Sequence, residues 1–310
     1  MANERIAIIG NGIIGHGTAQ VFAMAGHDVT MIGRNPASMA RALERIGASL
    51  KDFVAHGLLD EQVATDVPAR IATSVNLADA AMADFVLEAV TEDLALKVDI
   101  FGRLDALCRP ATILASSSGQ PASALVPKVQ RRERVIAAHF WYPPQLLPLV
   151  EICGGPYCDP AVVARTVDLI RRTGKQPVVI DKEVKGFIGN RLQFALLREA
   201  WSLWSQGVAR PEVIDAVVRA SFGRRLAITG PIESADIGGL ETMVAFARFL
   251  QPDLCVDRDP PPQVADAIKA PRGAGDWPGL YDWRQRDRQT LVDARMAELF
   301  RWLAQDRRTS

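Results

Sequence analysis

Three polar side chains could share acid–base chemistry: His139, Glu151 twelve residues later, and Asn190 beyond the next predicted strand. A hydroxyl that loses a hydride must also lose a proton, and a neutral imidazole with a pKa of about 6.5 suits that step. A carboxylate on the far ring nitrogen would fix the tautomer and stabilise the imidazolium. The trio predicts an acid–base pair with a polar clamp. The alternative is a structural histidine in the core, because His139 follows the apolar run Arg134–Ala138.

Composition and charge narrow the class of protein. The chain has 310 residues, 48% of them hydrophobic, which is enough for two domains with a core each. Its 36 lysines and arginines balance 36 aspartates and glutamates. No excess of positive charge is therefore available to hold a nucleic-acid backbone or an anionic membrane surface. We expect a globular protein whose partner is a small molecule.

The cysteines and the N-terminal segment indicate the compartment. Cys108, Cys153, Cys158 and Cys255 lack the paired short spacing of a zinc site, and their scatter suggests no disulfide framework. Met1–Arg5 is polar, and glycines break the apolar stretch that follows, so neither a signal peptide nor a membrane helix is expected. These features favour a cytoplasmic protein without a metal site.

The first half of the chain alternates short β-branched runs with helical patterns, which is typical of a parallel α/β sheet. Strands are expected at Ile6–Ile9, Val29–Ile32, Phe85–Glu88, Thr112–Ala115, Val135–Ala138, Leu149–Ile152 and Pro177–Ile180. A helix from about Ala161 to Thr173 joins the last two.

The second half has a different texture, with apolar residues at helical spacing. Helices are expected in Gly186–Gly207, in Arg210–Arg219, in Leu240–Leu250 and from about Arg284, with loops at Asp259–Pro262 and Arg272–Trp283. The sequence thus predicts a mostly parallel sheet domain over residues 1–184 and an all-helical domain over residues 185–310. The helices carry more apolar surface than a lone bundle needs, so we expect a homodimer through this domain.

A glycine motif follows the first predicted strand and opens a helix: Gly10-Asn11-Gly12-Ile13-Ile14-Gly15. Gly10 would allow the tight turn, Gly12 would let a pyrophosphate approach the backbone, and Gly15 would let helix and strand pack closely. The helix that begins at Ile13 and Ile14 would direct its N-terminus at the phosphates. In this position the motif predicts a Rossmann-type domain that binds a nicotinamide dinucleotide.

The end of the second predicted strand departs from that pattern. An acidic residue usually bonds the adenosine ribose there, but this chain has Gly33 followed by Arg34. Without a carboxylate a 2′-phosphate is not repelled, and an arginine can bind it in bidentate fashion. This favours NADP over NAD as the cofactor. The alternative is that Arg34 stacks on the adenine of either form.

Four segments together resemble the L-3-hydroxyacyl-CoA dehydrogenase family: Gly10–Gly15, Glu88–Lys97, His139 with Leu149–Glu151, and Gly186–Arg191. The resemblance covers nearly the whole chain. It implies that Glu92 and Lys97 contact the nicotinamide riboside, that His139 is the base with Glu151 as its partner, and that Asn190 holds the substrate oxygen. Taken alone, Glu92 and Lys97 would be interpreted as an ordinary exposed pair.

The second half is similar to one branch of that family, the L-gulonate dehydrogenase and λ-crystallin group, in Asn190–Trp201 and Arg225–Glu233. The branch acts on small carboxylates. Arg225, beside Leu226, Ala227 and Ile228, could therefore anchor a substrate carboxylate. An arginine of the surface or of a subunit interface is the alternative.

Two departures from the family bear on the substrate. Where the family has a serine that bonds the reacting hydroxyl, this chain has Gly119, so Ser117 or Ser118 would substitute. Similar Ser-Gly-x-Pro stretches occur in relatives that oxidise substituents on pyridine carboxylates. Tyr142 replaces an asparagine and adds aromatic bulk near the base. Both departures favour a substrate that is shorter or flatter than an acyl-CoA.

The sequence predicts an NAD(P)-dependent oxidoreductase that transfers a hydride between the nicotinamide and the secondary alcohol of a small hydroxy acid. An acyl-CoA thioester is the first alternative, although no dense lysine cluster accompanies Lys51 to bind its phosphates. A catalytically silent dinucleotide-binding protein is the second. The presence of His139, Glu151 and Asn190 together argues against it, because a protein without turnover has no physical need for that trio.

Overall fold

The computed structural model describes residues 3–269 and 279–309. The chain forms two compact units. The first runs to Ile188 and takes in the chain from Asp293 onward, and the second is Gly189–Val292. The division lies four residues after the predicted boundary at residue 184, and the last helix contributes to the first unit rather than to the second alone.

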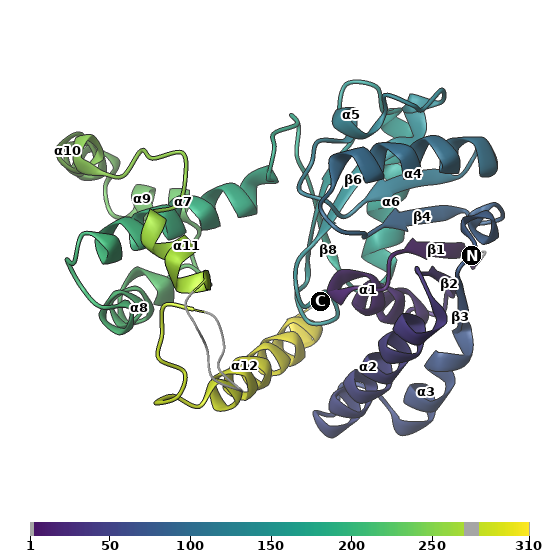
Figure 1. The fold of residues 1–310 in the computed structure, drawn as a ribbon, viewed down its shortest axis with the longest axis horizontal. Coiled ribbons are helices and arrows are strands. Elements are labelled where there is room, and N and C mark those ends of the chain that lie inside the picture. The colour runs from purple at the N-terminus through teal and green to yellow at the C-terminus, as the bar shows by residue number, and fades with distance from the viewer. Residues whose placement is uncertain (1–2, 270–278, 310) are drawn as a thin grey trace. The chain divides into compact units, whose positions relative to one another are not determined.

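An eight-stranded sheet forms the centre of the first unit (Figure 1), with strand order β3-β2-β1-β4-β5-β6-β7-β8. The strands are β1 Arg5–Ile9, β2 Asp28–Ile32, β3 Ile71–Ser74, β4 Phe85–Glu88, β5 Ile113–Ser116, β6 Val135–Phe140, β7 Leu149–Cys153 and β8 Gln176–Val179. All neighbouring strands are parallel except β6 and β7, which are antiparallel. This confirms the predicted mostly parallel sheet.

Helices cover the sheet, and local signals mark where they begin. They are α1 Ile13–Met24, α2 Pro36–Ala55, α3 Glu61–Asp66, α4 Leu94–Leu107, α5 Ala122–Leu125 and α6 Pro160–Arg172, with 3₁₀ turns at Val67–Arg70, Leu77–Ala80 and Arg132–Arg134. The side chain of Asn35 accepts a hydrogen bond from the backbone N–H of Ser38 at the start of α2. The side chain of Asp93 accepts a hydrogen bond from the backbone N–H of Leu96 at the start of α4. These caps fix the N-termini of both helices, which follow the carboxyl ends of β2 and β4.

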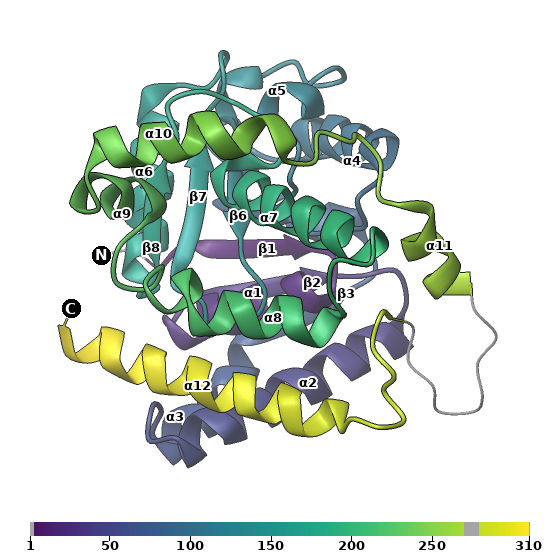
Figure 2. The ribbon, with the colours of Figure 1, turned by 90° about the vertical axis from the view of Figure 1, so that its left-hand side faces the viewer.

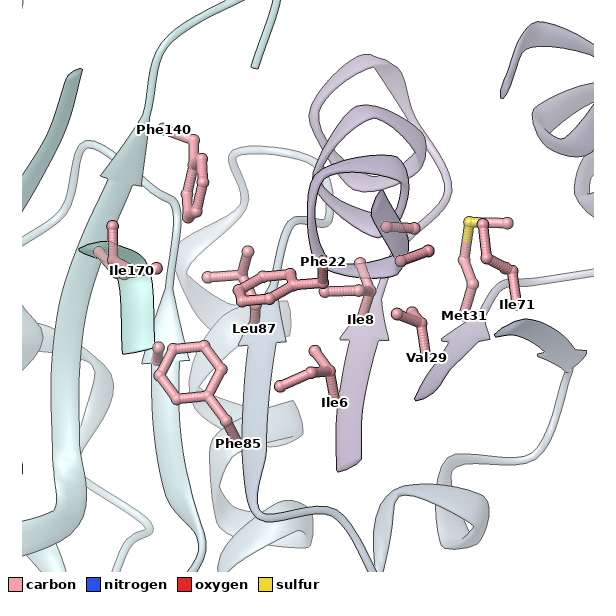
Figure 3. Packing of buried hydrophobic residues seen from close by; sticks show 14 of the residues in the cluster. Ile6, Ile8, Phe22, Val29, Met31, Ile71, Phe85, Leu87, Phe140 and Ile170 are labelled. Carbon is pink, nitrogen blue, oxygen red and sulfur yellow. The ribbon is translucent and has the colours of Figure 1, made fainter. Parts of the chain in front are cut away.

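The core packs on both faces of the sheet. Figure 3 shows Phe22 of α1 above the strands, beside Leu87 and Ile8. Its ring centroid lies 6.0 Å from that of Phe85 and 6.3 Å from that of Phe140. Aromatic packing at these distances fixes α1, which carries the glycine motif at its start, against the strands.

The last helix, α12 (Arg288–Thr309), lies beside α2 in both ribbon views (Figures 1 and 2). Phe300 and Leu303 of α12 are buried with Phe53 of α2 and Leu146. The rings of Phe53 and Phe300 meet edge to face, with centroids 5.3 Å apart. This apolar contact is why the C-terminal segment belongs to the sheet unit.

The second unit is helical, as predicted. Its helices, labelled in Figure 2, are α7 Phe187–Ser205, which begins in the first unit, α8 Pro211–Ala220, α9 Pro231–Ile237, α10 Leu240–Leu250 and α11 Pro262–Lys269, with 3₁₀ turns at Phe222–Arg224 and Gln251–Asp253. The predicted loop at Asp259–Pro262 ends where α11 begins. Residues 272–278 of the loop predicted at Arg272–Trp283 lie outside the described residues.

Three details differ from the sequence prediction. The edge strand β3 was not expected, because only Ile71 of its four residues is buried and no apolar run marks it. The last helix starts at Arg288 rather than near Arg284. Strand β6 continues to Phe140, so His139 lies within the strand and not after it.

Candidate active site

The antiparallel pairing of β6 with β7 places His139 directly opposite Glu151. His139 Nδ1 lies 2.9 Å from Glu151 Oε2, and both side chains are buried. A hydrogen bond of this length to a carboxylate favours the tautomer with the proton on Nδ1. The structure therefore brings together the base and the orienting acid that the sequence predicts.

Further donors hold the Glu151 carboxylate in place. The indole N–H of Trp141 donates to Oε2 at 3.2 Å, and the backbone N–H of Ile188 donates to Oε1 at 3.0 Å. The His139 ring stacks on Phe187 with centroids 5.5 Å apart and meets Trp141 edge to face. These contacts fix the orientation of the imidazole. No sequence pattern marks Trp141 and Phe187, apart from their closeness to His139 and to the predicted helix start.

The serine segment after β5 lies beside the same strand. The Ser117 hydroxyl accepts a hydrogen bond from the backbone N–H of Phe140, at 3.1 Å, one residue from His139. The Ser118 hydroxyl instead donates to Glu92 Oε1 at 2.6 Å. The carbonyl of Gly119 accepts from the backbone N–H of Gly186 at 2.8 Å. Of the two serines, Ser117 is the one that bonds the strand carrying His139.

A buried charge network lies behind this segment. Glu88, at the end of β4, is fully buried and accepts hydrogen bonds from Lys97 Nζ at 2.8 Å and from Ser116 Oγ at 2.6 Å. Lys97 Nζ also lies 3.4 Å from Glu92 Oε2. The side chain of Lys97 is only 1% exposed, so the interpretation of Glu92 and Lys97 as an ordinary exposed pair does not hold. Sequence reasoning missed Glu88, although an acid that ends an apolar strand was a signal for it.

The glycine motif forms one wall of a cavity of about 510 Å³. The other described lining residues come from the end of β2 and from α2 (Ile32, Gly33, Arg34, Ser38, Arg41, Arg45), from the segment after β4 (Ala89, Val90, Thr91) and from α4 (Leu96, Ile100, Arg103), with Ile9, Val75 and Leu77. The cavity lies at the carboxyl ends of β1, β2 and β4, where parallel α/β sheets bind ligands.

The glycines of the motif fit a dinucleotide. Gly10 has a φ of +112°, and a Cβ there would lie 2.5 Å from the carbonyl oxygen of Ala89. A Cβ on Gly15 would lie 2.0 Å from the carbonyl oxygen of Gly10. A Cβ on Gly12 would meet no atom within 4 Å, so its position opens onto space that a pyrophosphate can enter. Ile13 and Ile14 begin α1, as predicted.

His16, in the first turn of α1, is a polar group that the sequence did not single out. Burial lowers the pKa of its imidazole, a hydrogen bond to the Gly12 carbonyl raises it, and the positive charge of Arg45 lowers it again. The net direction is downward, so a neutral ring is favoured near the glycine motif at neutral pH.

Three predicted residues remain, two in the second unit and one in the first. Asn190 and Arg225 belong to the second unit, where Arg225 and the neighbouring Leu226 and Ile228 are exposed. Tyr142 follows β6 and is 55% exposed. The roles of these three side chains stay predictions.

Within residues 3–269 and 279–309 no group of histidine, cysteine and acidic side chains is arranged to hold a metal ion. The four cysteines are free thiols. None of the helices in the described part of the chain combines the length and the apolar character needed to cross a bilayer.

Comparison with known proteins agrees with this geometry. Residues 5–184 match the NAD-binding domain of 3-hydroxyacyl-CoA dehydrogenase, and residues 186–275 match its C-terminal domain. The chain belongs to the 3-hydroxyacyl-CoA dehydrogenase family. As a member of that family, with its NAD-binding domain, it is an oxidoreductase that acts on the CH–OH group of its substrate.

Individual family members resemble the chain over most of its length. It is 33% identical, over 301 residues and 96% of each chain, to 5-formyl-3-hydroxy-2-methylpyridine 4-carboxylate 5-dehydrogenase of Mesorhizobium japonicum. It is 34% identical to lambda-crystallin of Oryctolagus cuniculus over 78% of this chain and 76% of the relative. A crystal structure described as an NAD+-dependent dismutase, the 5-dehydrogenase of the same pyridine carboxylate, has a TM-score of 0.83, with 32% identity and 99% and 98% coverage.

Proposed function

We propose that this family member oxidises the secondary alcohol of a small hydroxy acid, or reduces the matching ketone, with His139 as the acid–base group. The observation that carries the proposal is the 2.9 Å contact between His139 Nδ1 and Glu151 Oε2. With the Nδ1 proton directed at the carboxylate, Nε2 is the ring nitrogen that would accept the hydroxyl proton.

The charges of the pair support this direction of proton transfer. When His139 takes up a proton it becomes an imidazolium, and the adjacent Glu151 carboxylate stabilises the new charge. Trp141 and Ile188 keep that carboxylate fixed, so little reorganisation accompanies the transfer. The bound dinucleotide supplies the hydride acceptor. In the reverse reaction His139 returns the proton to the carbonyl oxygen.

Ser117 would take the place of the serine that the family carries at the position of Gly119. Its hydroxyl oxygen accepts the N–H of Phe140, which leaves the hydroxyl hydrogen to bond a substrate oxygen. Ser118 is less suited, since its hydrogen is directed at Glu92. Asn190 would hold the same substrate oxygen.

A small or aromatic carboxylate is the substrate class that we propose. The absence of a side chain at Gly119 and the aromatic bulk of Tyr142 favour a short, flat molecule, and Arg225 would anchor its carboxylate. The resemblance to a dehydrogenase whose name specifies a pyridine carboxylate supports this choice. The family description supports an acyl-CoA as the second candidate.

For the cofactor we propose NADP as the preferred form, on the basis of Gly33 and Arg34 at the end of β2. Parallel fluorescence titrations with NADH and NADPH test the preference without a substrate. Tighter binding of NADH would contradict this preference and would indicate NAD as the cofactor, as in the crystallised relative.

The test of the catalytic proposal is hydride transfer, followed at the nicotinamide absorbance with a panel of hydroxy acids, pyridine carboxylates and hydroxyacyl-CoA esters. His139→Gln should lower kcat by about 10²- to 10⁴-fold and leave cofactor affinity unchanged. His56→Gln is the matched control, because His56 is an exposed histidine on the same unit. Activity that survives His139→Gln refutes the assignment of the base. Cofactor binding without turnover of any panel member favours the silent protein.

A further inference from the structure

The cavity beside the glycine motif is basic on one side. Its described lining includes four arginines, Arg34 after β2, Arg41 and Arg45 on α2, and Arg103 on α4, and it includes no aspartate or glutamate. Since a dinucleotide-binding sheet usually places an acid at the end of the second strand, this charge distribution is reversed.

The helical period explains why α2 presents arginines to the cavity. Ser38, Arg41 and Arg45 follow one another at intervals of three and four residues, which is one face of a helix. The opposite face is buried in the core through Met39, Ala42, Ile46, Leu50 and Phe53. Packing of that apolar face therefore fixes the direction of the arginines.

The four guanidinium groups have no protein partner in the described part of the chain, since no hydrogen bond or ion pair links them to another side chain there. Other arginines of the same unit are paired. Arg134 binds Asp105 at 2.7 Å, and Arg172 binds Glu4 at 2.8 Å. The positive charge around the cavity is thus left for a ligand, and the ligand that it fits is an anion.

Gly33, at the end of β2, is closely surrounded by side chains of α2 and of the glycine motif. A Cβ at residue 33 would lie 2.2 Å from the sulfur of Met39, which is buried, and 3.1 Å from the Asn11 side chain. A side chain at residue 33 would therefore require the Met39 thioether to shift, whereas glycine fits this packing as it stands. Because Gly33 lines the cavity without a side chain, it offers no carboxylate that would repel a phosphate on the adenosine ribose.

We propose that Arg34 and Arg41 form a phosphate subsite that binds the 2′-phosphate of NADP. The inference rests on the proposed function and identifies the residues behind its cofactor preference. Two guanidinium groups from different elements can bind one phosphate dianion from two sides. Arg45 lines the same cavity, and its charge acts on His16 in the first turn of α1.

The group recognised is a phosphomonoester on an adenosine ribose. NADP carries it at the 2′ position, and coenzyme A carries it at the 3′ position. We assign the subsite to NADP because the same cavity contains the glycine motif for a dinucleotide pyrophosphate. Adenosine 2′,5′-bisphosphate and adenosine 3′,5′-bisphosphate are the probes that separate the two sources, with 5′-ADP as the reference without the extra phosphate.

The experiment is calorimetric titration of the full chain with these three probes, and fluorescence titration with NADPH and NADH. The 2′,5′-bisphosphate should bind at least about tenfold tighter than 5′-ADP, and Arg34→Ala and Arg41→Ala should each weaken NADPH about 10- to 100-fold while NADH changes less than about twofold. Lys51→Ala is the control, because it removes a positive charge from an exposed position of α2 that does not line the cavity.

Equal binding of NADH and NADPH, tighter binding of the 3′,5′-bisphosphate, or an equal loss in Lys51→Ala overturns the subsite. None of these results bears on His139, whose role is tested by turnover. Loss of turnover in His139→Gln with these affinities unchanged would in turn leave the subsite in place, so the two proposals fail separately.

Discussion

Glu88 is a fully buried carboxylate whose charge is balanced by Lys97. Breaking such a pair leaves an uncompensated charge in the core, at a typical cost of about 3–5 kcal/mol. We predict that Glu88→Gln lowers the free energy of unfolding by about that amount, measured by urea titration. The exposed Glu44→Gln should change it by less than about 0.5 kcal/mol.

The double variant Glu88→Gln/Lys97→Met tests whether the lost stability comes from the unpaired charge or from the altered packing. It should recover part of the lost stability, because no buried charge is left without its partner. A double variant that is less stable than Glu88→Gln alone would contradict the ion-pair explanation.

Lys175 is a buried ammonium group with an unfavourable environment. Burial, and after it the positive charge of Arg307, lowers its pKa to about 7, although Nζ donates to the carbonyl of Leu147 at 2.8 Å. An unfolded lysine has a pKa of about 10.4, so between these values the unfolded chain binds more protons than the folded chain. The contribution of Lys175 to stability therefore rises with pH from about 7 to about 10, and its penalty is fully present below pH 7.

We predict that Lys175→Met is more stable than the parent chain at pH 7 and that the difference narrows towards pH 9, by up to about 1.4 kcal/mol per pH unit. Urea unfolding at pH 7, 8 and 9 measures it, with the exposed Lys182→Met as the control. A difference that stays constant with pH would show that Lys175 is charged in the folded protein over the whole range.

At the scale of elements, the β1–α1 turn contains one glycine that the packing requires and one that leaves space for a ligand. A Cβ on Gly15 would overlap the backbone of Gly10, whereas a Cβ on Gly12 would meet nothing. We predict that Gly15→Ala lowers the melting temperature by several degrees, because backbone must move. Gly12→Ala should melt like the parent chain yet bind NADH at least about tenfold more weakly, since the added methyl group occupies the path of the pyrophosphate.

Differential scanning fluorimetry and NADH titration on the two variants check this pair. Gly47→Ala is the control, since a Cβ at this α2 position also meets nothing within 4 Å and lies outside the cavity. Unchanged NADH affinity in Gly12→Ala would contradict the placement of the pyrophosphate.

Sequence patterns suffice to predict the central strands of the sheet but not its edge strand. Strands β1, β4 and β6 are mostly apolar, as expected of strands buried on both faces, and each was predicted. Strand β3 lies at the edge of the sheet, is mostly unburied and has only four residues, so its sequence lacks such a run. Its pairing with β2 is a tertiary contact that no local pattern encodes.

At the scale of the whole molecule, the second unit leaves large apolar side chains on its surface. Exposed ones on α9 and α10 include Ile232, Ile237, Phe246 and Phe249, the last 72% exposed. Large exposed apolar side chains on two helices that contact each other are typical of a protein interface. We therefore propose that a second copy of the chain binds this surface, in line with the homodimer predicted from the apolar surface of the helices.

We predict that the chain sediments as a dimer, with twice its mass of 33.8 kDa, and that Ile237→Asp/Phe249→Glu sediments as a monomer, because each buried charge in an apolar interface is strongly unfavourable. Met82→Glu, an exposed apolar position of the first unit, is the control. A monomeric parent chain would refute the dimer, and analytical ultracentrifugation decides between the two.

The sequence by itself determined the fold class and the dinucleotide motif, and it predicted His139 and Glu151 as a candidate acid–base pair, because these depend on local periodicity, on glycine sterics and on residue chemistry. Only the tertiary structure decided that His139 lies opposite Glu151, since that contact depends on the register of β6 and β7. It also decided that Lys97 is buried and that four arginines from three elements face one cavity. Burial and convergence are properties of pairs of elements distant in sequence, and spacing along the chain cannot specify them.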